Sequence, residues 1–119
     1  MTLPPAEAGA TGSPDGLLTV RTEQHNDHRV IVVSGEIDMS TAPLLDQEVL
    51  RAEADGPRPI VVDLRQVTFM DLRGLQLLLT ASARSRADAK RLSVVRGPRA
   101  VQRLFELTGT EALVPFVDR

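Results

Sequence analysis

Two short acidic segments hold the residues of this sequence that are best placed to do chemistry. Asp71 directly precedes an expected helix and follows the apolar run from Ile60 to Leu64. Helix N-termini offer free backbone N–H groups and the positive end of the helix dipole, so an anion, a capping carboxylate or a phosphorylated hydroxyl is favoured there. Spacing alone favours a simple N-cap for Asp71. The second segment is Gly35-Glu36-Ile37-Asp38. Its last carboxylate, that of Asp38, could pair with that of Asp71 for acid–base chemistry.

The same segments argue against an enzyme and against a metal site. Neither contains a histidine or a second polar group that would define a nucleophile or a proton relay. No strand-to-helix turn carries a glycine-rich phosphate loop with its lysine, which disfavours a nucleotide-binding protein. His25 and His28 fall in an expected turn with no third ligand nearby, so we expect them to be solvated. We therefore expect no enzymatic activity, no cofactor and no metal.

The composition indicates one small domain. A chain of 119 residues can form one ordinary core but not two domains of usual size. The net charge of -2 and the pI near 5.6 argue against a nucleic-acid or anionic-membrane surface. The sequence has no cysteine, which excludes disulfides and is compatible with a reducing cytosol. It shows neither a membrane span nor a secretion signal, so we expect a cytoplasmic protein.

The hydrophobic pattern predicts an α/β domain that follows a flexible tail. Residues 1–16 are rich in Pro, Gly and Ala and offer almost nothing to bury, so we expect a tail there and a domain over residues 17–119. After a first hairpin, each strand is followed by a helical crossover, which favours parallel pairing. The expected order is strands at 18–24 and 30–34, a helix ending near 54, a strand at 60–64, a helix starting near 72, a strand at 92–95, a helix at 98–107 and a strand at 113–117.

Several segments, in this order and at these separations, resemble the STAS domain of bacterial anti-sigma factor antagonists. The segment VSGEID before the first helix is similar to the family's Gly-Glu-hydrophobic-Asp loop. The resemblance covers about Leu17 to Arg119. It implies a STAS-like β-β-α-β-α-β-α-β fold, with a mixed, mostly parallel sheet and helices packed on one side. The matching residues are 33–38 with 40–42, 62–71, 74–75, and 95–107 with Gly109.

The resemblance implies a switch protein that acts through binding. Family members bind an anti-sigma factor that is also an ATP-dependent serine kinase, and so release a sigma factor for RNA polymerase. Phosphorylation of the antagonist by that kinase breaks the complex, because a phosphate adds about -1.5 to -2 charges to the docking surface. ATP would belong to the kinase partner. Alternatives are a scaffold in a stress-signalling assembly or the STAS subunit of a lipid transporter, where no phosphorylation is needed.

The sequence departs from the family where the switch should lie. The family has Asp-Ser-Ser/Thr-Gly, with the first hydroxyl as phosphoacceptor, whereas Asp71 is followed by Leu72, Arg73 and Gly74. Leu72 has no hydroxyl, and Arg73 places a cation where a helix favours anions. We expect an antagonist that still docks but has lost its switch; regulation through another hydroxyl, or another class of partner, is the alternative. Nearby hydroxyl groups belong to Ser40, Thr41 and Thr68, which we expect to be two caps and a turn residue.

We expect the partner-binding surface to consist of two segments brought together at one edge of the sheet. Asp38 and Asp71 would provide charge and caps, Met39 and Leu72 apolar contact, and Gly74 a close approach. Many family members continue into a further helix after the last strand; without it, part of one sheet face would be exposed and could bind a partner or form a homodimer. The expected surface residues are Asp38, Met39, Ser40, Thr41, Asp71, Leu72, Arg73 and Gly74.

Overall fold

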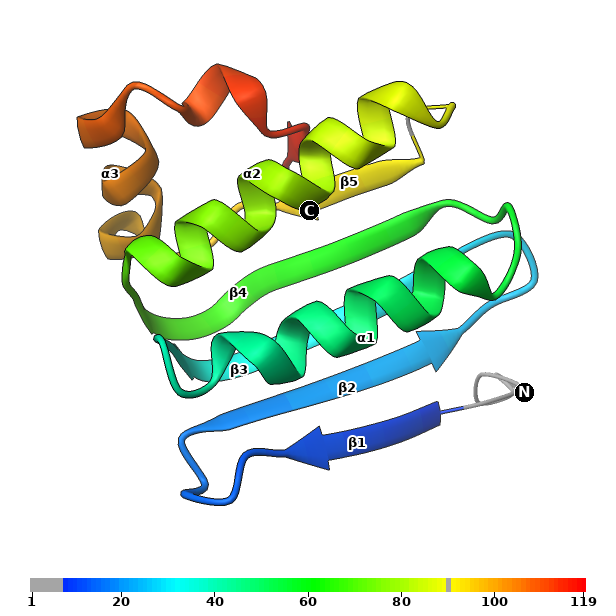
Figure 1. Cartoon of the computed structure of the whole chain (residues 1–119), viewed down its shortest axis with the longest axis horizontal. Coiled ribbons are helices and arrows are strands. Elements are labelled where there is room, and N and C mark those ends of the chain that lie inside the picture. The colour runs from blue at the N-terminus through cyan, green and yellow to red at the C-terminus, as the bar shows by residue number, and fades with distance from the viewer. Residues whose placement is uncertain (1–7, 90) are drawn as a thin grey trace.

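Six strands form a single sheet whose spatial order follows the chain, β1-β2-β3-β4-β5-β6 (Figure 1). The structure is a computed structural model, and it describes residues 8–89 and 91–119. The strands are β1 (Ala8–Gly12), β2 (Leu18–Gln24), β3 (Arg29–Ile37), β4 (Ile60–Met70), β5 (Leu92–Val95) and β6 (Phe116–Val117). The helices are α1 (Ala42–Ala54), α2 (Leu72–Ala87), α3 (Arg99–Thr108) and the short 3-10 helix η1 (Glu111–Leu113).

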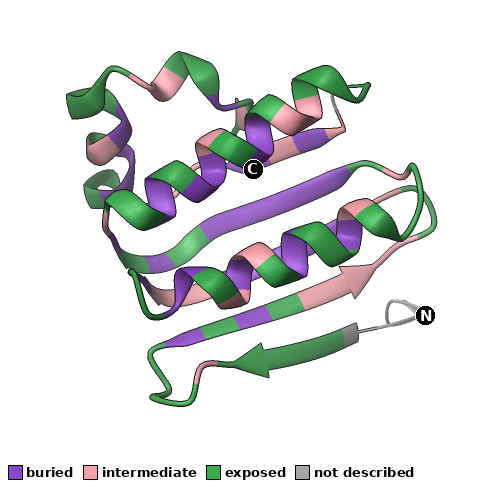
Figure 2. Ribbon diagram, in the orientation of Figure 1, coloured by how far each residue is buried: buried purple, intermediate pink, exposed green. Residues whose placement is uncertain are grey.

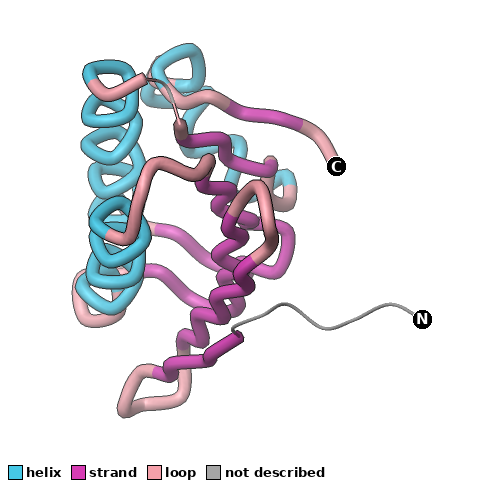
Figure 3. Tube along the Cα trace, turned by 90° about the vertical axis from the view of Figure 1, so that its right-hand side faces the viewer, coloured by secondary structure: helices cyan, strands magenta, loops and turns pink. Residues whose placement is uncertain are grey.

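From β2 onward, the pairing of the strands is the one that the sequence predicts. β2 and β3 form an antiparallel hairpin, closed by a turn in which His25 N–H donates to the carbonyl of His28 (2.9 Å). β3, β4, β5 and β6 pair in parallel, and β1 adds an antiparallel edge. α1 and α2 lie side by side over one face of the sheet (Figure 3). The expected α/β class and mixed, mostly parallel sheet are therefore confirmed.

The core lies between the helices and the central strands (Figure 2). α1 buries Leu45 and Val49, which the helical spacing predicts to share one face. β4 is buried from Ile60 to Leu64, as expected for a central strand covered on both faces. A second, smaller cluster of buried valines comprises Val30, Val32, Val61 and Val95.

Three strands have bounds that differ from the prediction. β4 continues to Met70, where the sequence predicted a short turn, so Thr68 is an exposed strand residue. The reason is that β3 also runs further, to Ile37. After two register shifts, it still provides partners for the backbone hydrogen-bonding groups of β4. The last predicted strand, 113–117, is instead the 3-10 helix η1 followed by the two-residue β6.

The tail prediction is wrong for part of its range. β1 lies within the segment 1–16 and pairs with β2, from Ala8 opposite Glu23 to Gly12 opposite Thr19. Residues 9–12 of this strand are exposed, and the strand is defined by its backbone ladder with β2. The β1–β2 turn is held by Ser13, whose hydroxyl donates to Asp15 (2.6 Å). Residues 1–7 of the predicted tail lie outside the described residues.

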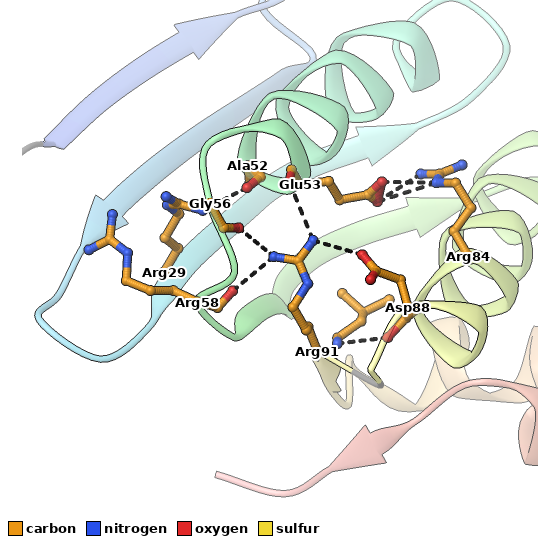
Figure 4. A network of polar contacts seen from close by, with 10 residues as sticks. Arg29, Ala52, Glu53, Gly56, Arg58, Arg84, Asp88 and Arg91 are labelled. Carbon is orange, nitrogen blue, oxygen red and sulfur yellow. Dashed lines mark hydrogen bonds and ion pairs between the residues drawn. The ribbon is translucent and has the colours of Figure 1, made fainter.

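Arginine side chains close the end of the sheet at which β3, β4 and β5 begin (Figure 4). The guanidinium of Arg29 is fully buried and donates to the carbonyl of Ala52 (2.6 Å) and to that of Asp55, at the C-terminus of α1. Arg91 donates to the carbonyl of Gly56 (2.5 Å). These bonds satisfy carbonyls that the helix leaves free and complement its negative end. This end of the fold is therefore fixed by internal bonds.

Asp63 illustrates how a buried charge is held within β4. Its side chain is almost completely buried, and Arg65 donates to it through Nη2 (2.8 Å), Nε (3.1 Å) and the backbone N–H (3.0 Å). Burial by itself raises the pKa of Asp63, but the hydrogen bonds and the charge of Arg65 outweigh burial and leave the pKa below its ordinary value. The ionised form is the one that the fold stabilises.

We expect the Asp63→Asn variant to lose less free energy of unfolding in acid than the unsubstituted chain does. Because the pKa of folded Asp63 is lower than the unfolded value of about 3.9, Asp63 stabilises the fold above that pH and loses this effect as the pH falls through its folded pKa. Urea unfolding at pH 7 and pH 3 measures the difference. The unsubstituted chain should lose more free energy of unfolding between these pH values than the variant; equal losses would contradict the account.

Candidate functional site

The loops after β3 and β4 leave the sheet side by side. Ile37 and Met70 are the last paired residues of the two strands, and the N–H of Asp71 donates to the carbonyl of Ile37 (3.0 Å). Asp38 and Asp71 thus follow neighbouring strand ends, at the carboxyl edge where loops of parallel strands gather. The structure brings together the two segments that the sequence singles out.

The first loop is organised by Asp38. One oxygen of its carboxylate, Oδ1, accepts from the Ser40 N–H (2.8 Å), the Ser40 hydroxyl (2.7 Å) and the Thr41 N–H (3.1 Å). These bonds, led by the Ser40 hydroxyl, hold the pKa of Asp38 below its ordinary value. The N-cap residue of α1 is Thr41, but its hydroxyl donates to the carbonyl of Glu36 (2.8 Å) and makes no capping bond. Of the three candidate caps, Asp38 is the one whose carboxylate accepts backbone N–H groups.

The second loop confirms the N-cap that spacing predicts. The carboxylate of Asp71 accepts from the backbone N–H groups of Arg73 (2.8 Å) and Gly74 (3.3 Å) at the start of α2. Both carboxylates therefore accept hydrogen bonds from backbone N–H groups of their own loop or helix start. The site is built to present other side chains, not a pair of free carboxylates.

Four exposed side chains lie at the end of β4, in the loop after β3 and in the first turn of α2, and we call them the edge patch: Met39, Phe69, Leu72 and Arg73. Met39 is 68% exposed, Leu72 58% and Phe69 49%, and Arg73 is also exposed. Phe69 is absent from the predicted surface, because the sequence predicts a turn where β4 continues. Thr41 and Gly74 belong to the predicted surface but are buried beneath it.

A groove between α1 and α2 extends from the edge patch. Its volume is about 330 Å³, and Met39 and Arg73 belong to both the patch and the groove. Apolar side chains from both helices contribute to its lining, with polar and charged groups beside them. The lining residues are Met39, Ala42, Pro43, Asp46, Arg73, Gln76, Leu77, Thr80 and Arg84.

The two histidines make local contacts. Their rings stack in the β2–β3 turn with centroids 4.7 Å apart, and His28 Nδ1 lies 2.7 Å from Asp27. Over residues 8–89 and 91–119, no group of three or more His, Cys, Asp or Glu side chains could hold a metal ion. None of the helices in that part of the chain is both long enough and apolar enough to cross a membrane.

Comparison with known proteins agrees with this architecture. The family model described as "Mlab, STAS domain" matches residues 20–115, which is most of the chain. The chain belongs to the STAS domain family. The resemblance inferred from the loop before α1 and from the β4–α2 segment is thereby confirmed.

The relatives of this STAS domain include named antagonists. An anti-sigma-B factor antagonist of Staphylococcus aureus (strain NCTC 8325 / PS 47) is 31% identical over 97 residues, which cover 82% of this chain and 90% of that protein. The crystal structure of an anti-sigma factor antagonist from Mycobacterium paratuberculosis is 36% identical, covers 92% of both chains and has a TM-score of 0.76. The unphosphorylated antagonist SpoIIAA, at 22% identity and a TM-score of 0.69, is similar in fold.

The start of α2 in this STAS domain packs closely against both strand ends. A Cβ atom at Gly74 would lie 2.7 Å from Cγ of Met70 and 2.8 Å from Cγ2 of Ile37. Both neighbours are buried and cannot swing into solvent. The absence of a side chain at Gly74 therefore sets how close α2 begins to the β3–β4 pair.

We expect Gly74→Ala to destabilise the fold although alanine is the better helix former. The helix preference favours alanine by about 1 kcal/mol, whereas overpacking a filled core costs about 1–3 kcal/mol. Urea unfolding should show a net loss. Gly9→Ala is the matched control, since a Cβ atom there meets nothing within 4 Å. A Gly74 variant as stable as the Gly9 variant would contradict the close packing.

Proposed function

We propose that this STAS domain is an anti-sigma factor antagonist that binds an anti-sigma factor through the edge patch and so releases a sigma factor for transcription. The observation that carries the proposal is the pair of large apolar side chains, Met39 and Leu72, exposed at the edge to which β3 and β4 deliver their loops. Exposed apolar clusters of this kind mark protein-binding surfaces. The names of the S. aureus and M. paratuberculosis relatives support the same role.

The proposed mode of action is binding without chemistry. The carboxylates of Asp38 and Asp71 already accept hydrogen bonds from their own loops, which leaves them poorly suited to transfer protons. The partner would be an anti-sigma factor of the serine-kinase type, and any ATP would be bound by that partner. We place the complex in the cytoplasm, where the polymerase and its sigma factors act.

We further propose that the complex has no phospho-switch at the start of α2. Leu72 stands where the family pattern has its acceptor hydroxyl, and it is exposed but carries no oxygen. Of the nearby hydroxyls, Thr41 is buried, while Ser40 donates to Asp38 (2.7 Å) and would place a phosphate beside that carboxylate. Thr68 is exposed on β4. The antagonist would therefore stay active in the presence of the kinase.

Because the switch hydroxyl is absent, we consider a second function that does not depend on phosphorylation. A STAS subunit that serves as a scaffold in a stress-signalling or lipid-transport complex needs no phosphorylation. Purification of the full chain from its native cell, followed by mass spectrometry, separates the two functions. Recovery of a kinase-like anti-sigma factor supports the proposal, and recovery of transporter subunits in its place contradicts it.

We expect Leu72→Glu to weaken binding of the purified anti-sigma factor by at least about 30-fold. A charge at the centre of an apolar contact would be buried without a partner, which costs about 2 kcal/mol or more. Isothermal titration calorimetry measures the affinity, and thermal unfolding of the same variant should be unchanged because Leu72 is exposed.

Leu107→Glu is the matched control for this variant. Leu107 is 71% exposed on α3 and does not belong to the edge patch, so its variant should bind as the unsubstituted chain does. Unchanged binding and unchanged stability of Leu72→Glu would refute the patch. A large loss of thermal stability would show that Leu72 packs inward.

We expect no phosphate on the α2 start when the chain is incubated with the cognate kinase and ATP. Intact-mass measurement followed by peptide mapping tests this expectation. Leu72→Ser restores a hydroxyl at the helix start and should permit phosphorylation there, although Arg73 beside it could slow recognition by the kinase. A full equivalent of phosphate on Ser40, Thr41 or Thr68 of the unsubstituted chain would contradict a constitutively active antagonist.

A further inference from the structure

Arg73 is the exposed cation of the edge patch, and the fold gives it no partner within the described residues. Its backbone N–H donates to Asp71, but its guanidinium takes part in no hydrogen bond or ion pair among residues 8–89 and 91–119. Its position in the first turn of α2 places a cation at the positive end of the helix dipole, which is unfavourable. Other arginines that bond to carboxylates or carbonyls include Arg29, Arg65, Arg84, Arg91 and Arg96. Arg99, Arg103 and Arg119 resemble Arg73 in making no such bond within the described residues, but they do not line the groove.

The groove beside Arg73 is apolar along part of its lining and carries charged side chains along the rest. Buried Ala42 and Leu77 contribute to it from the two helices. At the other end Arg84 is neutralised, because Nε donates to Glu53 (2.9 Å) and Nη2 donates to the same carboxylate (3.1 Å). These bonds, with a smaller effect of Asp46, raise the pKa of Arg84. Arg73, at the end that meets the edge patch, is the cation of the groove lining without a hydrogen bond or ion pair among the described residues, and Asp46 of α1 is a lining carboxylate that is likewise unpaired there.

We propose that the groove between α1 and α2 takes an amphipathic segment of the anti-sigma factor, with a carboxylate of that segment paired to Arg73. This inference rests on the proposed function and extends the docking surface from the edge patch along the two helices. An amphipathic helix in a groove buries its apolar side chains against the lining. A guanidinium at the mouth of the groove matches a carboxylate with two parallel hydrogen bonds, which fixes the register of the segment.

The probe for the test is the purified cognate anti-sigma factor, free of phosphate, and the measurement is its affinity for the full chain at two salt concentrations. Arg73→Ala should weaken binding about 10-fold and Arg73→Glu about 100-fold, and both should reduce the salt dependence of the affinity. Thr80→Trp fills the groove without altering the edge patch and should also weaken binding about 10-fold. Arg21→Glu, at an exposed arginine on β2, is the matched control and should bind normally.

Each combination of results has a distinct meaning. If Leu72→Glu prevents binding while the Arg73 and Thr80 variants bind like the unsubstituted chain, the groove inference is overturned and the proposed function stands. If Arg73→Glu weakens binding but Thr80→Trp does not, the carboxylate lies outside the groove and the inference is again overturned. If none of these variants changes binding, the edge patch is not the docking surface, and the proposed mode of binding fails together with the groove inference. Restoration of Arg73→Glu binding by one Asp→Arg or Glu→Arg change in the partner would confirm the ion pair.

Discussion

The parallel pairing of β3 with β4 up to their last residues is the constraint on which the site depends. It joins Ile37 to Met70 and lets the N–H of Asp71 bond to the Ile37 carbonyl (3.0 Å). Gly74 then admits α2 to within contact of both strand ends. The loops after β3 and β4 have no freedom to separate, so residues more than thirty positions apart in the sequence form one surface.

The electrostatics of the site follow from this geometry. Asp38 and Asp71 lie where backbone N–H groups are free, and both carboxylates are engaged in ordering their own loops. The side chains left exposed there include the apolar Met39 and Leu72 and the cation of Arg73, and these form the surface that we propose for the partner. The opposite end of the sheet is closed by the bonds of Arg29 and Arg91 to carbonyl groups (Figure 4). A bonded scaffold at one end and exposed side chains at the other are the arrangement that the proposed docking role needs, because a preordered surface loses less conformational freedom on binding.

Regular hydrophobic periods made much of this fold predictable. The spacing of Leu45 and Val49 gave the buried face of α1, and the position of Asp71 gave the N-cap of α2. The end of β4 was not predictable, because its polar residues break the alternation and its register with β3 shifts twice. β1 escaped notice because small side chains leave no pattern when only the backbone pairs. The groove depends on the spacing of two helices, which a single sequence does not encode in any local pattern.

The central claim is that the carboxyl edge of β3 and β4 contacts the partner. Amide NMR spectra of the labelled full chain, recorded with and without the unlabelled anti-sigma factor, test it most directly. The account predicts that signals of residues 38–41 and 69–74 shift or broaden, and that those of residues 52–58, at the opposite end, do not. Changes confined to residues 52–58, with the edge patch unaffected, would contradict it.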